Sequence, residues 1–160
     1  MGGLSRRASV IAETPKPRLV VEGGNWAWKS SYIKDSQVPQ QKLKAELQLH
    51  AFQRSGIDAI GIGASDLVLG LDWFQERTED HPFIATNMQC GERYPFQRYQ
   101  VTEKAGLQLG VVSLISQKAK IDGCSIESPS DAVEAVLKDQ KDVDLWIVLS
   151  GLPEKENQAL

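Results

Sequence analysis

Short apolar runs that alternate with amphipathic stretches are the feature that most limits how this chain can fold. The spacing of apolar residues, with prolines near the starts and glycines near the ends of some segments, predicts helices. They cover residues 2–13, 40–56, about 66–77 and 128–140. Runs rich in Val, Ile and Leu predict strands over 18–24, 57–63, 82–88 and 143–151, and a hairpin within 96–116. Strands that alternate with helices favour parallel pairing, so the sequence predicts an α/β fold. We expect a mainly parallel sheet with helices on its faces and an antiparallel hairpin turned at Gly106.

Single residues indicate how the second expected helix lies and where it ends. Leu43, Leu47 and His50 or Ala51 follow the three-to-four spacing of a stripe that faces a core. Gly56 is the expected C-cap, because glycine adopts the left-handed conformation that ends many helices. We therefore expect this helix to cover the sheet with its leucines inward.

The last helix and the last strand carry similar signals. Ser128 and Pro129 suit the N-cap and the first turn of the helix. The strand over 143–151 is nearly all apolar, which is typical of a strand buried on both faces. An uncovered edge strand would invite association, so we expect a partner or a further segment to cover any open edge near the ends of the chain.

Length and charge narrow the function classes. The chain has 160 residues, enough for a single domain over 1–160 with its own core. Its 18 basic and 21 acidic residues are interspersed and give a formal net charge of −3. Nucleic-acid binding would need clustered basic residues, and the tight pair Arg6 and Arg7 is interpreted as the outer face of the first helix. No apolar run approaches the ~18 residues of a membrane span, and we expect no export signal in this chain.

The two cysteines, Cys90 and Cys124, lie far apart in the sequence. Their spacing excludes a CxxC redox or metal motif. Two interpretations stay open: one disulfide, if the protein is exported, or two buried thiols.

A turn of small residues over 61–65, "GIGAS", follows the second expected strand, where open α/β folds place their active sites. The segment around Ser65 lacks the second glycine of the Gly-x-Ser-x-Gly motif that forms a nucleophile elbow. The turn also lacks the third glycine of GxGxxG and the Lys-Ser/Thr of a P-loop. Asp66, in the first turn of the next helix, opposes an anion there. A structural turn is therefore favoured over either kind of site.

Metal ligands are scarce. The candidates are His50, His81, Glu22, Asn25 and Asp66, and neither histidine has a partner at ligand spacing. A zinc site needs three or four converging donors. We therefore expect no metal or other cofactor.

A long loop after the first strand carries Trp26, Trp28 and Tyr32. Tryptophans in loops often anchor protein interfaces, because one ring buries a large area and its N–H finds a partner. The alternative is that Trp26 or Trp28 folds back into the interior. Trp73 and Trp146 are expected in the core.

Four stretches, "GGLSRRASVI", "LVVEGGN", "GIDAIGIGASDLVLGLDWF" and "VDLWIVLSGL", resemble one family in their order and approximate spacing. That family is the N-terminal metallophosphoesterase domain of 5'-nucleotidases and UDP-sugar hydrolases. The resemblance extends from about Gly2 to Leu152 and implies a partial α/β/β/α fold. In the family, carboxylates, imidazoles and an asparagine at the ends of strands hold two metal ions that activate water and bind a phosphate.

The resemblance places the ligand motifs of the family on residues that are poor ligands. The aspartate of Gly-Asp falls on Asn25, and the Asn-His-Glu of the next motif falls on Ala64, Ser65 and Asp66. The histidine after the "VLS"-like strand falls on Gly151. The opening Asp-x-His and the closing Gly-His-x-His have no counterpart in this chain. The resemblance therefore implies a degenerate site with no catalytic residues.

The function expected from this comparison is a non-catalytic structural or protein-interaction module. Trp26, Trp28 and Tyr32 are the expected partner-binding residues. The resemblance implies a periplasmic or cell-surface location and a partner chain, with a multihaem cytochrome or another envelope complex as the candidate class. Two rivals stand beside it: a metal-dependent phosphohydrolase completed by another chain, and a sensor that binds a nucleotide or phosphate.

Overall fold

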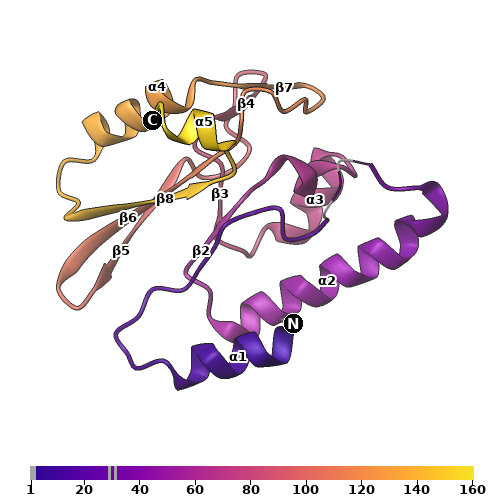
Figure 1. The fold of residues 1–160 in the computed structure, drawn as a ribbon, viewed down its shortest axis with the longest axis horizontal. Helices are drawn as coiled ribbons and strands as arrows, with labels where there is room; N and C mark the ends of the chain where they lie inside the picture. The colour runs from indigo at the N-terminus through magenta and orange to yellow at the C-terminus, as the bar shows by residue number, and fades with distance from the viewer. Residues whose placement is uncertain (1–2, 29, 31) are drawn as a thin grey trace.

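The computed structural model describes residues 3–28, 30 and 32–160 (Figure 1). Its helices are α1 (Leu4–Glu13), η1 (Asp35–Gln37), α2 (Val38–Ser55), η2 (Ala64–Leu67), α3 (Leu71–Thr78), α4 (Pro129–Asp139) and α5 (Glu154–Asn157). Its strands are β1 (Val21–Glu22), β2 (Ala59–Gly61), β3 (Phe83–Ile84), β4 (Met88–Cys90), β5 (Tyr99–Lys104), β6 (Leu107–Leu114), β7 (Cys124–Ile126) and β8 (Leu145–Ser150). Each expected helix and strand has a counterpart, and the sequence did not predict η1, η2, β4, β7 and α5.

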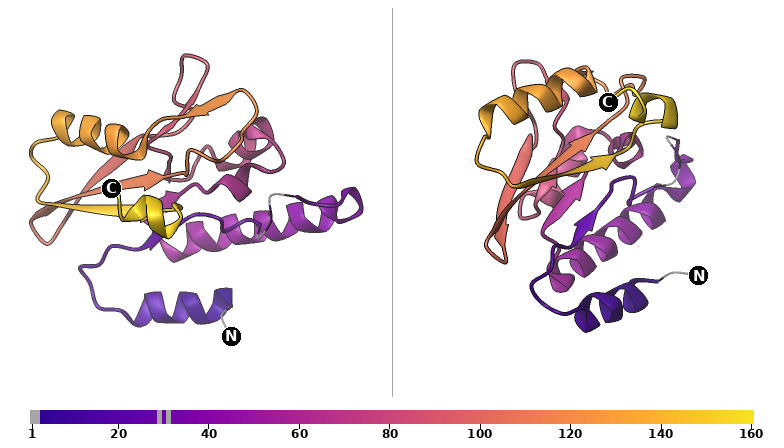
Figure 2. Two further views of the ribbon diagram at one scale, coloured as in Figure 1. Left: turned by 45° about the horizontal axis from the view of Figure 1, so that its top comes forward. Right: turned by 60° about the vertical axis from the view of Figure 1, so that its left-hand side comes forward.

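Within the described residues, the strands form two three-stranded sheets and a two-stranded ribbon. β1, β2 and β3 pair in parallel in that order. In the second sheet β6 pairs in parallel with β8 and antiparallel with β5, while β4 and β7 form the antiparallel ribbon. The sheets face each other, with α1 and α2 outside the first and α4 outside the second (Figures 1 and 2). The expected α/β fold is confirmed, and its parallel strands are divided between two layers.

Two buried polar residues after β3 connect the sheets. The Asn87 side chain donates to the carbonyl oxygens of Ile115 at 2.8 Å and Glu127 at 3.1 Å, and it accepts the N–H of Ile115 at 2.9 Å. The Thr86 hydroxyl accepts the N–H of Ser113 at 2.9 Å. Ser113 is near the end of β6 and Ile115 directly follows it, so the parallel strands of both sheets end at the same end of the molecule.

The core has two main parts. One packs α2, α3 and the first sheet around buried aromatic and aliphatic side chains, including Phe52, Ile60, Phe74 and Phe83. The other lies between the sheets and contains Ala59, Ile84, Val111 and Leu149. Alternation along β2 explains the split, because successive side chains of a strand point to opposite faces.

Several local signals in the sequence are confirmed. Gly56 ends α2 in the left-handed region, with φ 61°. The Ser128 hydroxyl accepts the N–H of Asp131 at 3.4 Å and caps α4. Ala105 and Gly106 have φ 57° and 80°, as a tight hairpin turn requires.

The expected helix over 66–77 is wrong as a single element. A short 3-10 turn, η2, is followed by Gly70 at φ 91°, and α3 starts only at Leu71. Glycine lacks a Cβ and tolerates this conformation, which interrupts the helical hydrogen-bond ladder.

The buried face of α2 also differs from the expectation. Ala45, Leu49 and Phe52 are buried, while Leu43 and Leu47 are 67% and 60% exposed. Positions two apart lie about 200° apart around a helix, so the two stripes point in nearly opposite directions. The stripe that contains Phe52 buries the larger side chain, and burying it stabilises this orientation.

Two further expectations are corrected at the edges of the molecule. β8 is the outer strand of its sheet, and Leu145 and Val148 are 55% and 40% exposed, so the strand is not buried on both faces. Arg7 does not lie on the outer face of α1, because its guanidinium donates to the Glu22 carboxylate and lies 5.5 Å from the centre of the Phe52 ring.

Cys90 and Cys124 lie opposite each other in the β4–β7 ribbon and form a disulfide. This pairing decides between the two interpretations that the sequence left open. None of the helices in the described residues combines the length and apolar character that crossing a membrane requires.

Candidate functional site

The candidate site lies where the segment after β1 meets the turn after β2. β1 and β2 are parallel neighbours, so the residues that follow them, 23–28 and 62–67, emerge at the same sheet edge. This is the position where open α/β folds bind their ligands. It brings together Asn25, Ala64, Ser65 and Asp66.

Asn25 and Ser65 hydrogen-bond to each other. The Asn25 Oδ1 atom accepts the Ser65 N–H at 3.1 Å and lies 2.7 Å from the Ser65 hydroxyl oxygen. That hydroxyl is also 2.7 Å from the carbonyl oxygen of Trp28, and its one proton serves one acceptor at a time. The Asn25 amide lies directly over Gly63, where a Cβ would come within 2.1 Å of Oδ1. The sequence contained no sign of this network beyond the glycine itself.

Asp66 is fully buried and binds backbone rather than a ligand. Its carboxylate accepts the N–H groups of Asn25 at 2.7 Å, Ala27 at 2.9 Å and Gly63 at 2.9 Å. Burial raises the pKa of Asp66 from 3.8 to about 6, because desolvation penalises the charged form, while the backbone hydrogen bonds act in the opposite direction. The side chain therefore fixes the path of the chain after β1.

Ala64 and Gly151 offer no side-chain donor. Ala64 is exposed at the start of η2. Gly151 follows β8 in the other sheet, and its N–H donates to the carbonyl oxygen of Leu114 at 2.9 Å. Because the parallel strands of both sheets end together, Gly151 lies at the same end of the molecule as Asn25.

The donor set does not fit a centre of two metal ions. Such a centre needs several carboxylates and imidazoles around closely spaced cations. Here the Asn25 and Asp66 oxygens already accept hydrogen bonds from the chain itself. Among the described residues, no three or more His, Cys, Asp or Glu side chains lie together as a metal would require. We therefore derive no reaction step through a metal.

The remaining metal candidates lie apart and have other partners. His50 is exposed on α2, and the Nε2 atom of His81 lies 3.2 Å from the carbonyl oxygen of Leu49. Glu22 is paired with Arg7.

The expected partner-binding role of Trp26 and Trp28 is corrected, because both rings fold into the interior. Trp28 is 4% exposed, and its ring lies 5.3 Å from that of Trp73. Trp26 lies 5.3 Å from Phe52 and 5.8 Å from Phe83, measured between ring centroids. The backbone bonds from Asp66 to Asn25 and Ala27 turn the loop inward. Tyr32 is 70% exposed, and its partner-binding role stays a prediction.

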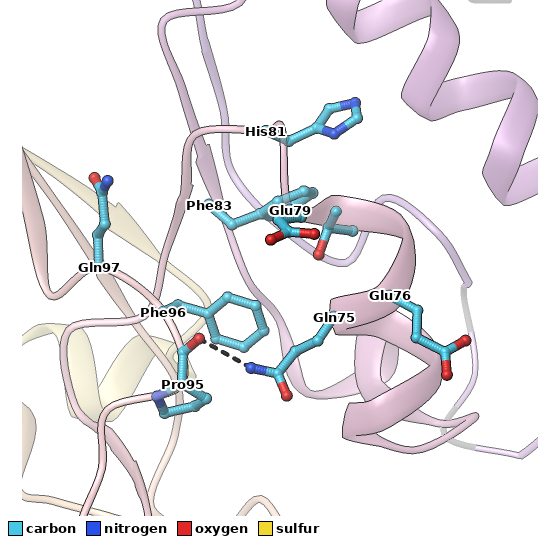
Figure 3. Close-up of a pocket in the computed structure, with 9 residues that line it drawn as sticks. Gln75, Glu76, Glu79, His81, Phe83, Pro95, Phe96 and Gln97 are labelled. Atoms are coloured by element: carbon cyan, nitrogen blue, oxygen red, sulfur yellow. Dashed lines mark hydrogen bonds between the residues drawn. The ribbon is translucent and has the colours of Figure 1, made fainter.

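A hollow that the sequence did not reveal lies at the other end of the first sheet from the candidate site. It has a volume of about 570 Å³ and lies between α3 and residues 95–97 (Figure 3). The rings of Phe83 and Phe96 line it, the Glu79 carboxylate lies at its rim, and the Gln75 amide donates to the carbonyl oxygen of Pro95 at 3.2 Å. Phe83 begins β3, so this hollow is distinct from the site after β1 and β2.

Comparison by sequence identifies no relative: no family model and no curated protein matches the chain. Comparison by structure finds proteins of similar fold. A 5'-nucleotidase precursor from Thermus thermophilus superposes with a TM-score of 0.81 over 98% of this chain and 32% of its own, at 16% identity. The chain has a 5'-nucleotidase-like fold.

Other solved structures agree. The NAD nucleotidase (NadN) of Haemophilus influenzae matches with a TM-score of 0.74 at 12% identity, covering 99% of this chain and 30% of its own. A putative 5'-nucleotidase from Staphylococcus aureus matches with a TM-score of 0.73 at 13% identity, covering 94% and 32%. The chain thus spans about a third of the length of these neighbours. The resemblance inferred from the sequence is confirmed at the level of the fold.

Proposed function

We propose that this protein is a non-catalytic binding module built on the 5'-nucleotidase-like fold, with no metal or other cofactor. The observation that carries the proposal is the closed network at the candidate site. Asn25 binds Ser65, Asp66 binds three backbone N–H groups, and Ala64 and Gly151 present no ligand atom. A hydrolase of this fold would need free anionic and imidazole ligands at those places.

The partner is proposed to be another protein chain, with an envelope complex such as one containing a multihaem cytochrome as the candidate class. The disulfide between Cys90 and Cys124 supports a periplasmic or cell-surface location, because such bonds persist in oxidising compartments. Exposed Tyr32 is the aromatic residue of the long loop that is available to a partner.

The test is a metal and activity assay on the purified chain. The protein is incubated with Mn²⁺, Mg²⁺ or Zn²⁺ and desalted, and its metal content is measured; release of phosphate from AMP and p-nitrophenyl phosphate is followed in parallel. We expect substoichiometric metal and rates equal to the blank. The Thermus thermophilus 5'-nucleotidase is the positive control.

Two bound metal ions per chain, with turnover that a chelator abolishes, would contradict the proposal. Asn25→Ala then serves as the matched variant. Loss of that turnover in the variant would place a working metal site where we propose none.

A further inference from the structure

The outer strands of the two sheets lie on the same side of the molecule. β1 is an end strand of the first sheet and β8 of the second. Leu19 and Val21, before and within β1, pack in the same cluster as Ile147 and Leu149 of β8. Figure 2 shows both strands along one side of the layered structure. Within the described residues, the space between the sheets is therefore flanked there by two strands that pair with no strand on their outer side.

β8 lacks two of the features that protect edge strands, charged residues and proline. Its sequence, LWIVLS, contains no charge and no proline, and Leu145 and Val148 are 55% and 40% exposed. Such an edge is a template for pairing with another strand.

The β1 edge borders a groove. The groove has a volume of about 730 Å³ and is bounded by α1, β1 and α2. Its lining is mixed: Leu4, Val10 and Ile11 of α1, together with Val20 and Val21, are apolar, and Val10 is 58% exposed. Arg6, Arg7 and Gln48 also line it. An apolar strand that entered this groove would pair with β1 and be covered by α1.

The charges next to the two edges are complementary. The segment 14–20 before β1 carries Lys16 and Arg18 and no acidic residue. The segment 140–144 before β8 carries Asp142 and Asp144 against one lysine. Since β1 and β8 both run toward the end of the molecule where the sheets are joined, each charged segment lies at the entry end of its strand.

We propose that this open side is the interface of a two-fold dimer, in which β8 of each copy adds to β1 of the other. A two-fold axis parallel to the strands keeps their direction, and it places the first sheet of one copy in line with the second sheet of the other. The edge of β1 in each copy then lies beside the edge of β8 in the other copy. The basic segment of one copy then faces the acidic segment of the other. This deepens the proposed binding role by naming a second copy of the chain as one partner, and it rests on that role.

The first test is the mass of the chain in solution, measured by light scattering and sedimentation between about 1 µM and 1 mM, a range that brackets micromolar dissociation constants. We expect a species of twice 17.7 kDa. Val148→Lys, which places a charge on the β8 edge, should weaken the dimer at least about tenfold. The control is Leu43→Lys, which also replaces an apolar side chain with a charged one but lies on the exposed face of α2. It should leave the dimer intact.

A monomer at all concentrations would overturn the proposal, and so would a dimer lost in Leu43→Lys but kept in Val148→Lys. If Val148→Lys fails to fold, hydrogen exchange of the backbone amides of the natural chain serves as the test. The amides of β1 and β8 should exchange more slowly as the protein concentration rises. Equal exchange at all concentrations would overturn the interface. Lys16→Glu should weaken the dimer, and adding Asp142→Lys should restore it. None of these measurements involves metal or turnover, so their failure is distinct from failure of the non-catalytic proposal.

Discussion

At the scale of single residues, the side-chain oxygens of Asn25 and Asp66 define the site, because they already accept hydrogen bonds from the chain itself. Asp66 is a buried carboxylate whose two oxygens accept three backbone N–H groups. The backbone of Asn25 lies in the left-handed region, with φ 53°, and its side-chain amide oxygen accepts the N–H of Ser65. Asparagine adopts this conformation more readily than most residues. These contacts give both side chains a structural role that explains their positions without a ligand.

The pKa of Asp66 predicts a pH dependence of stability. The folded state holds the pKa of this carboxyl at about 6 against its ordinary 3.8, so the folded state binds a proton first as the pH falls. The contribution of Asp66 to the free energy of unfolding should therefore rise as the pH drops from 7 toward 4, by up to about 3 kcal/mol, and be lost again above pH 6. Urea unfolding at several pH values measures it.

Asp66→Asn isolates this contribution, because the variant does not titrate at that position. Its stability should be lower throughout, since an amide accepts fewer of the N–H groups, but the difference from the natural protein should grow as the pH falls. Asp72→Asn, an exposed change in the first turn of α3, is the control and should keep the natural slope. Parallel pH profiles for Asp66→Asn and the natural protein would refute the assignment.

Asn87 offers a second prediction at this scale. Asn87→Ala would leave the N–H and carbonyl of Ile115 and the carbonyl of Glu127 without their partner in a buried place. We expect a loss of about 2–4 kcal/mol in the free energy of unfolding, measured in urea. Gln117→Ala, an exposed change after β6, should alter it by less than about 0.5 kcal/mol. Equal effects for the two variants would show that Asn87 does not join the sheets.

At the scale of elements, the parts with a strong local signal were predictable from the sequence. The spacing of apolar residues, Gly56 and Ser128 indicated α2 and α4, and Gly106 indicated the hairpin. The break at Gly70 was missed, because one glycine within an apolar helical pattern does not by itself end a helix. β4 and β7 were missed because strands of three residues are too short to show alternation.

Packing of β8 on β6 gives an element-scale prediction. The Trp146 ring lies over Gly110, where a Cβ would come within 2.4 Å of ring atom Cε3. Gly110→Ala should therefore cost about 1–3 kcal/mol, because the ring must move. In the Trp146→Leu background the same change should cost much less, and urea unfolding of the four proteins forms a double-mutant cycle. Additive losses would contradict the contact.

At the scale of the whole molecule, the division of strands between two sheets could not be derived from local pattern. Pairing of β6 with β8 joins Leu109 to Leu145, and no local periodicity specifies such a partner. The two-layer arrangement followed from the resemblance, which the superposition on known structures confirms. The positions of the degenerate site were also identified from the resemblance. The Asn25–Ser65 hydrogen bond and the inward orientation of the Trp26 and Trp28 rings depend on three-dimensional contacts and could not be predicted.

The disulfide contributes to stability at this scale, because it closes a loop with a sequence separation of 34. Replacing both cysteines, Cys90→Ser with Cys124→Ser, should lower the free energy of unfolding by about 2–4 kcal/mol, and reduction of the natural protein should lower it equally. Thermal unfolding with and without reductant measures both. Two titratable thiols in the native protein, with no effect of reductant, would show that the bond is absent.

The central claim is that the site after β1 and β2 is closed by its own hydrogen bonds. An anomalous difference map from crystals soaked in Mn²⁺ tests it most directly. The account predicts no peak between Asn25 and Asp66, with the Ser65 hydroxyl still about 2.7 Å from Asn25 Oδ1. Two strong peaks coordinated by Asn25 and Asp66, with the Asn25–Ser65 bond broken, would contradict it.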